Sequence, residues 1–112
     1  MNEEERARRV GENEALFRVV NERIESLNVA FAAITETMDV VCECGSIDCA
    51  ERVVLAISDY ERVREDPTHF VVLPGHELPG VESVVETGDG FVAVRKHEGL
   101  PADVARKTDP RA

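Results

Sequence analysis

All three cysteines of this chain lie in one short segment, Cys42-Glu43-Cys44-Gly45-Ser46-Ile47-Asp48-Cys49. Alternation along a strand would point Cys42 and Cys44 to the same side of the backbone, and Gly45 would permit the sharp turn that returns Cys49 to them. In a reducing compartment, clustered thiols indicate metal or redox chemistry before a disulfide framework, and an odd number of cysteines favours the same interpretation. A metal held by these thiolates would constrain the fold more than any other feature.

Zinc in structural sites has four ligands in a tetrahedron, usually from Cys and His. A fourth ligand should therefore come from a rigid turn elsewhere, and His76 directly follows Pro74-Gly75. We predict a Zn²⁺ site formed by Cys42, Cys44, Cys49 and His76. The alternatives for the fourth ligand are His69 at the head of a strand, His97 near the C-terminus, a carboxylate such as Asp48, or water.

Two other interpretations of the cysteines stay open. They could be small buried apolar residues, or two of them could pair on oxidation and release a bound metal. Structural zinc contributes about 10–16 kcal/mol of binding free energy in small peptides, against a total stability of about 5–15 kcal/mol for an ordinary domain. If zinc binds, it would therefore decide whether the loops at 42–49 and 74–78 are ordered.

The composition is that of a small globular chain with few aromatic residues. The chain has 112 residues, of which 43% are hydrophobic but only 4% aromatic, with no Trp. It is long enough for one domain, or for a compact domain with a helical extension. In such a small core a metal adds useful stability.

Charge and hydropathy narrow the possible partners and location. The formal net charge is −10, from 23 acidic and 13 basic side chains, which disfavours nucleic acid and anionic membranes as partners because their phosphates attract clustered Lys and Arg. No stretch approaches the roughly 20 apolar residues of a membrane span. The N-terminal residues 1–5 are acidic, unlike those of a signal peptide. We therefore expect a cytoplasmic location.

The first third of the chain has the pattern of a long amphipathic helix, which we predict over residues 1–36. Apolar residues and one Asn alternate at spacings of 3 and 4, as in a heptad repeat: Val10, Asn13, Phe17, Val20, Ile24, Leu27, Phe31 and Ile34. This stripe either packs on the sheet of its own domain or pairs with a second copy or another protein. The other face would be exposed and could recognise a protein partner, or simply be solvated, through Asn13, Glu14, Arg18, Asn21, Glu22 and Arg23.

The remainder predicts a small α+β domain over residues 37–97. Its strands are expected at 38–42, 52–57, 69–73, 81–86 and 91–96, mostly antiparallel, with the second buried on both faces. Thr87-Gly88-Asp89-Gly90 is a hairpin signal. One short helix is expected at 58–66, with Ser58 and Glu61 as a capping box. Residues 98–112 are expected to form a flexible tail, or a short helix around 102–107.

Several motifs together resemble a set of small uncharacterised actinobacterial proteins that carry a C-x-C-x4-C segment and a downstream P-G-H turn. The resemblance covers nearly the whole chain and is carried by residues 13–18 and 21–24, Cys42-Glu43-Cys44, Cys49, Tyr60-Glu61, Arg64, Asp66-Pro67, Phe70, Pro74-Gly75-His76 and residues 109–111. It implies that the three cysteines and His76 act as a unit. It implies no activity.

Known enzyme motifs are missing from the sequence. There is no glycine-rich nucleotide-binding loop, no nucleophile elbow and no H-E-x-x-H, and Cys42-Glu43-Cys44 lacks the spacing of a zinc deaminase. We therefore predict a non-enzymatic, zinc-binding protein-interaction or regulatory module. Its partner would be another protein or a second copy, bound through the N-terminal helix. The alternative is a thiol and zinc redox sensor in which metal release changes how the helix docks.

Overall fold

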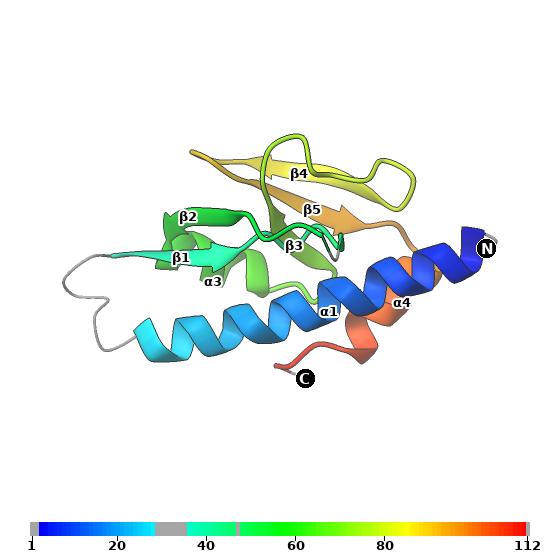
Figure 1. Ribbon diagram of the computed structural model, residues 1–112, viewed down its shortest axis with the longest axis horizontal. Coiled ribbons are helices and arrows are strands. Elements are labelled where there is room, and N and C mark those ends of the chain that lie inside the picture. Colours follow the sequence, from blue (N-terminus) through cyan, green and yellow to red (C-terminus); the bar gives the residue numbers. More distant parts are fainter. Residues whose placement is uncertain (1–2, 29–35, 47, 112) are drawn as a thin grey trace.

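The described part of the chain forms two small antiparallel sheets, one long helix and two short helices (Figure 1). The computed structural model describes residues 3–28, 36–46 and 48–111, with the backbone alone for residues 3–7 and 28. The elements are α1 Glu3–Asn28, β1 Thr37–Val41, β2 Arg52–Ala56, α3 Ile57–Arg64, β3 His69–Val72, β4 Glu82–Thr87, β5 Val92–Lys96 and α4 Leu100–Lys107. The predicted α+β class is confirmed. Among the described helices, none combines the length and apolar character needed to cross a bilayer.

The five strands lie close to where the short apolar runs of the sequence predict them, but they form two sheets. β1 and β2 make a two-stranded sheet with Val40 opposite Val53. β5 lies between β3 and β4 in a three-stranded sheet, with Phe70 opposite Val94. The inward-facing side chains of both sheets and Tyr60 from α3 meet in one core.

Two local predictions are wrong. α3 begins at Ile57, so Ser58 lies inside the helix, and the N-cap residue Ala56 has no side chain that can cap. β2 alternates between buried and exposed side chains, and Val54 is 57% exposed. β2 is therefore covered on one face only.

The C-terminal segment is a packed helix and not a flexible tail, which selects the second of the two sequence-based alternatives. α4 buries Ala102 and Ala105 and lies beside α1 (Figure 1). The two helices approach closely at Gly11, where an added Cβ would lie 2.9 Å from Cγ1 of Val104. Beyond α4, the guanidinium of Arg111 forms ion pairs with Glu22, Glu25 and Glu61.

α1 docks on the domain mainly through a polar stripe, although Ile24 of the predicted apolar stripe also packs against the core. Besides Ala15, the buried positions are Gly11, Glu14, Arg18, Asn21 and Glu25, each of these five one residue beyond a position of the predicted stripe. Several apolar residues of α1 are instead exposed: Leu16, Val19, Val20 and Leu27. The predicted positions Phe31 and Ile34 lie outside the described residues, and Glu36 has a positive φ of 58° that no helix would have.

The buried charges of α1 have specific partners in the rest of the fold. Glu14 forms an ion pair with Lys96 of β5, which also pairs with Glu82 at 2.5 Å. Burial raises the pKa of Glu14 to about 8, although Lys96 opposes the shift. Arg18 donates to the carbonyl oxygens of Pro67 at 2.5 Å and Ala105 at 2.7 Å. These contacts tie α1 to β5, to α4 and to the turn before β3.

Candidate metal centre

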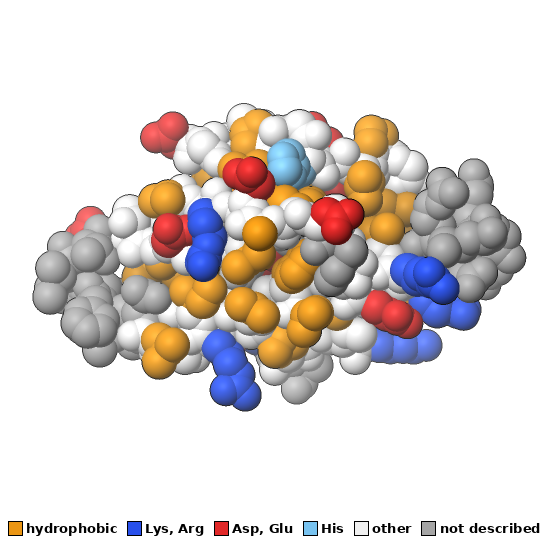
Figure 2. Space-filling view, in the orientation of Figure 1, with side chains coloured by type: hydrophobic (Ala, Val, Ile, Leu, Met, Phe, Trp, Pro, Cys, Tyr) orange, Lys and Arg blue, Asp and Glu red, His pale blue; other side chains and the backbone are white. Residues whose placement is uncertain are grey.

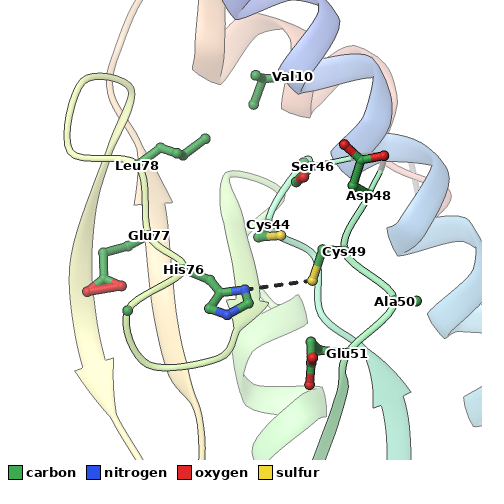
Figure 3. A pocket seen from close by; sticks show the side chains of 12 residues that line it. Val10, Cys44, Ser46, Asp48, Cys49, Ala50, Glu51, His76, Glu77 and Leu78 are labelled. Atoms are coloured by element: carbon green, nitrogen blue, oxygen red, sulfur yellow. Dashed lines mark hydrogen bonds between the residues drawn. The ribbon is translucent and has the colours of Figure 1, made fainter.

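The three cysteines and His76 converge at one point. Their ligand atoms all lie within 4.8 Å of one another, and Nδ1 of His76 is 3.7 Å from Sγ of Cys42 and 3.7 Å from Sγ of Cys49. A tetrahedral ion with usual zinc–sulfur and zinc–nitrogen bond lengths would hold sulfur and nitrogen about 3.6 Å apart. Figure 3 shows the imidazole turned toward Cys49, with Cys44 beside it. The cluster therefore has the dimensions of a metal site.

Backbone hydrogen bonds hold the cysteine segment in place at the end of the β1–β2 sheet. The amide of Cys42 donates to the carbonyl of Glu51 at 3.0 Å, and the amide of Cys49 donates to the carbonyl of Ser46 at 3.0 Å. Gly45, between them, has a φ of +80°, a conformation that costs other residues free energy. The chain therefore reverses between Cys44 and Cys49, as the sequence predicts.

The Pro74-Gly75 turn brings His76 to the cysteines. The amide of His76 donates to the carbonyl of Leu73 at 3.0 Å, and the amide of Leu73 donates to Sγ of Cys42 at 3.3 Å. An amide hydrogen bond to a ligating sulfur is a usual feature of the shell around a metal site. The segment after β3 therefore contacts Cys42 twice, through the imidazole of His76 and through the amide of Leu73.

The two alternative histidines lie elsewhere. His69 pairs with Asp66, with Nε2 3.5 Å from the carboxylate, and Nε2 of His97 lies 2.9 Å from the hydroxyl of Ser83. Neither belongs to the cluster formed by the described residues. The structure therefore selects His76 among the three histidines.

The thiols of Cys42 and Cys44 are buried in a way that opposes their ionisation. Burial raises the pKa of both thiols, and the neighbouring thiols raise that of Cys42 further. Without a compensating charge, these groups would remain neutral thiols. A divalent cation would supply that charge, because metal binding displaces the thiol protons.

Glu43 lies between Cys42 and Cys44 in sequence but faces away from them into the core. Its carboxylate accepts hydrogen bonds from Nδ2 of Asn21 at 2.7 Å and from the amide of Val71 at 3.0 Å. The hydroxyl of Tyr60 approaches it at 3.5 Å. The sequence-based prediction did not include this role, although strand alternation puts Glu43 on the face opposite Cys42 and Cys44.

Two asparagines of α1 hold the helix against β1 and the cysteine segment. Asn21 pairs with β1 as a further strand would, because Nδ2 donates to the carbonyl of Val41 and Oδ1 accepts from its amide, both at 2.7 Å. Asn13 donates to the carbonyl of Gly45 at 3.0 Å. The cysteine segment is therefore fixed between α1 and the sheets.

These contacts correct the predicted partner-binding set. Glu14, Arg18 and Asn21 are fully buried, so the prediction that they face solvent is wrong. Asn13 and Glu22 are half-buried, and Glu22 is bound to Arg64 at 2.7 Å. Of the six residues, only Arg23 is exposed.

A cavity of about 570 Å³ opens beside the cluster. Cys44, Cys49 and His76 form part of its wall (Figure 3), and three acidic residues also line it: Asp48, Glu51 and Glu77. Cys42 does not line the cavity and is buried. One side of the cluster is thus accessible, while the other is anchored in the core.

Replacing Gly45 by Ala should destabilise the protein by about 2–4 kcal/mol, combining the cost of positive φ with that of overpacking. The added Cβ would lie 2.8 Å from Cγ1 of Val10 and 2.9 Å from Cγ of Glu14, so α1 would have to move. The control is Gly80→Ala, because no atom lies within 4 Å of its Cβ position. Urea unfolding measures both, and equal stability of the two variants would contradict the close approach of the loop to α1.

Comparison with known proteins identifies no relative. No protein-family model matches the chain, and no curated protein or solved structure matches it. The resemblance to actinobacterial proteins therefore stays a prediction, and the function of the protein has to be inferred from the geometry of its own residues.

Proposed function

We propose that this protein is a non-enzymatic zinc-binding module in which Cys42, Cys44, Cys49 and His76 hold one structural Zn²⁺. The observation that carries the proposal is the meeting of four ligand atoms from two separate loops within 4.8 Å. Buried cysteines that served only as apolar residues would not require Nδ1 of His76 at 3.7 Å from Sγ of Cys42.

The donor set favours zinc. Soft thiolates and a borderline imidazole suit zinc better than magnesium or calcium, which prefer oxygen ligands. Four protein ligands complete a tetrahedron and leave no position for a water molecule or a substrate, as in structural rather than catalytic zinc sites. A reducing compartment such as the cytoplasm would keep the thiolates available.

The ion would act on the rest of the protein through α1. The cysteine segment contacts α1 through Gly45 and Glu43, so a loop fixed by metal would offer α1 a rigid docking site. The outward face of α1 would then be presented to a protein partner in a single orientation. This presentation is the interaction or regulatory role that we propose.

Metal analysis of protein purified without chelator tests the proposal. We expect one equivalent of zinc per chain in the parent, and less than about one tenth of that in Cys42→Ser and His76→Ala, since each removes one of four ligands. His69→Ala is the matched control and should retain the metal, because His69 lies outside the cluster. Less than half an equivalent in the parent, or full content in both ligand variants, would refute the zinc assignment.

A second candidate is the redox sensor, favoured by the position of Cys44 and Cys49 on the cavity wall. Peroxide could oxidise these two thiolates to a disulfide, with two electrons passing to the peroxide oxygens and zinc released. A chromophoric zinc chelator measures the release. Loss of zinc within minutes in mild peroxide, reversed by a thiol reductant, would favour the sensor, whereas retention for hours would favour the purely structural ion.

A further inference from the structure

The outward face of α1 carries a short stripe with opposite charges at its two ends. The stripe consists of Glu12, Leu16, Val19 and Arg23, whose spacings of 4, 3 and 4 keep them within one narrow sector of a helix. All four are exposed, and Leu16 is 53% exposed. Figure 2 shows hydrophobic side chains gathered along α1, with charged groups interspersed. Val20 and Leu27 are also exposed, Leu27 to 75%, and they widen the apolar surface.

This stripe lies opposite the buried side of α1. The domain-facing residues centre on Glu14, Arg18 and Asn21, about half a helical turn from Leu16 and Val19 at 100° per residue. No ion pair joins Glu12 or Arg23 to another described side chain. A partner could therefore reach the stripe without disturbing the fold.

The stripe is symmetric about its own centre. Positions 12 and 23 are equally far from the midpoint between Phe17 and Arg18, and so are positions 16 and 19. A second copy running antiparallel about a two-fold axis at that midpoint would place Leu16 against Val19 of its partner. The same axis would place Glu12 against the partner's Arg23, and the reverse pair would form at the other end.

We propose that α1 associates with α1 of a second copy in this antiparallel register. The pattern is self-complementary, as an isologous two-fold interface requires. Parallel pairing about a two-fold axis would instead bring Glu12 against Glu12 and Arg23 against Arg23, which like-charge repulsion disfavours. The charges thus select one direction as well as one register.

The expected association is modest. The four residues of the stripe span about 16 Å of helix, so the interface is smaller than those of tight, permanent dimers. Self-association should rise with concentration between about 1 μM and 1 mM, the range of dissociation constants expected for weak interfaces. This inference rests on the proposed function only in taking α1 as the element that binds a partner. The zinc content of the protein tests the proposed metal site independently of self-association.

Sedimentation velocity with charge variants tests the proposal. Glu12→Arg and Arg23→Glu should each weaken self-association about tenfold, because each turns both attractive pairs into repulsive ones. An equimolar mixture of the two variants should associate again, since the arginine introduced in one variant would face the glutamate introduced in the other wherever unlike chains meet. The double variant E12R/R23E should associate as the parent does.

The controls are Asp39→Arg and Arg52→Glu, which make the same charge changes at exposed positions on β1 and β2. Zinc content of each variant, compared with that of the parent, reports whether its fold is retained, independently of self-association. A parent that stays monomeric up to about 1 mM would overturn the proposal. So would a dimer that responds to the α1 variants no more than to the controls, because its interface would then lie elsewhere.

Discussion

The Cys42→Ser variant is expected to melt at least about 15 °C below the parent protein. When the free zinc concentration is about a thousandfold above the dissociation constant, zinc binding contributes about 4 kcal/mol of stability, which the variant loses. Each kcal/mol corresponds to roughly 4 °C of melting temperature in a domain of this size. Of the four residues of the cluster, Cys42 lies deepest. It is fully buried, and its sulfur also accepts a hydrogen bond from the amide of Leu73. Differential scanning calorimetry of zinc-loaded protein measures the shift.

A chelator separates the loss of the ion from the loss of the side chain. Removing zinc from the parent with a strong chelator should lower its melting temperature by a similar amount, while Cys42→Ser should not respond to chelator. His69→Ala, with its imidazole outside the cluster, should respond as the parent does. A parent whose melting temperature is the same with and without chelator would contradict a stabilising role for the ion.

Lys96→Met is expected to destabilise the protein by about 3–5 kcal/mol, the usual cost of removing one partner from a buried ion pair. Lys96 is buried between the carboxylates of Glu14 and Glu82. Without the ammonium group, the carboxyl groups of Glu14 and Glu82 would remain in the core with no cationic partner, and each would have to stay buried as an uncompensated charge or take up a proton. Urea unfolding at neutral pH measures the loss.

The adjacent residue supplies the matched control. Arg95→Met removes a positive charge from the same strand at an exposed position, so it should change stability by less than about 0.5 kcal/mol. Adding Glu14→Met to Lys96→Met removes one of the two carboxyl groups left without a partner, so the double variant should be more stable than Lys96→Met alone. A double variant that is less stable than Lys96→Met would contradict the electrostatic explanation.

The strands and the cluster of three cysteines and His76 could be predicted from the sequence because their signals are local. Short apolar runs bounded by turn residues locate all five strands. The close spacing of Cys42, Cys44 and Cys49 and the rigid turn before His76 indicate the cluster without knowledge of the tertiary fold. How the strands divide between two sheets depends on pairings such as that of β3 with β5, which no local pattern encodes.

The orientation of α1 could not be predicted because its buried face is polar. A helix is expected to bury its apolar stripe, yet here Glu14, Arg18 and Asn21 face the domain. Each is matched to partners far along the chain: Lys96, the carbonyl of Ala105, and Glu43. Burial of polar groups is tolerated when such partners exist, and only the tertiary structure reveals them.

The apolar residues of α1 are partly exposed as a consequence. If α1 pairs with a second copy, the exposed residues Leu16 and Val19, which lie beside the predicted heptad stripe, make the intermolecular contact, while the polar stripe on the opposite side of α1 serves the docking within the chain. The two alternatives drawn from the sequence, packing on the domain or pairing with another helix, would then both hold, on different faces of α1.

X-ray absorption at the zinc edge, on protein purified without chelator, tests the central claim most directly. The ion is expected to have three sulfur neighbours at about 2.3 Å and one nitrogen neighbour at about 2.0–2.1 Å, and the small amount of zinc that His76→Ala still binds should lack the nitrogen component. A first shell dominated by oxygen, or one with three sulfurs and a nitrogen that persists in His76→Ala, would contradict the assignment of Cys42, Cys44, Cys49 and His76 as the ligands of one zinc ion.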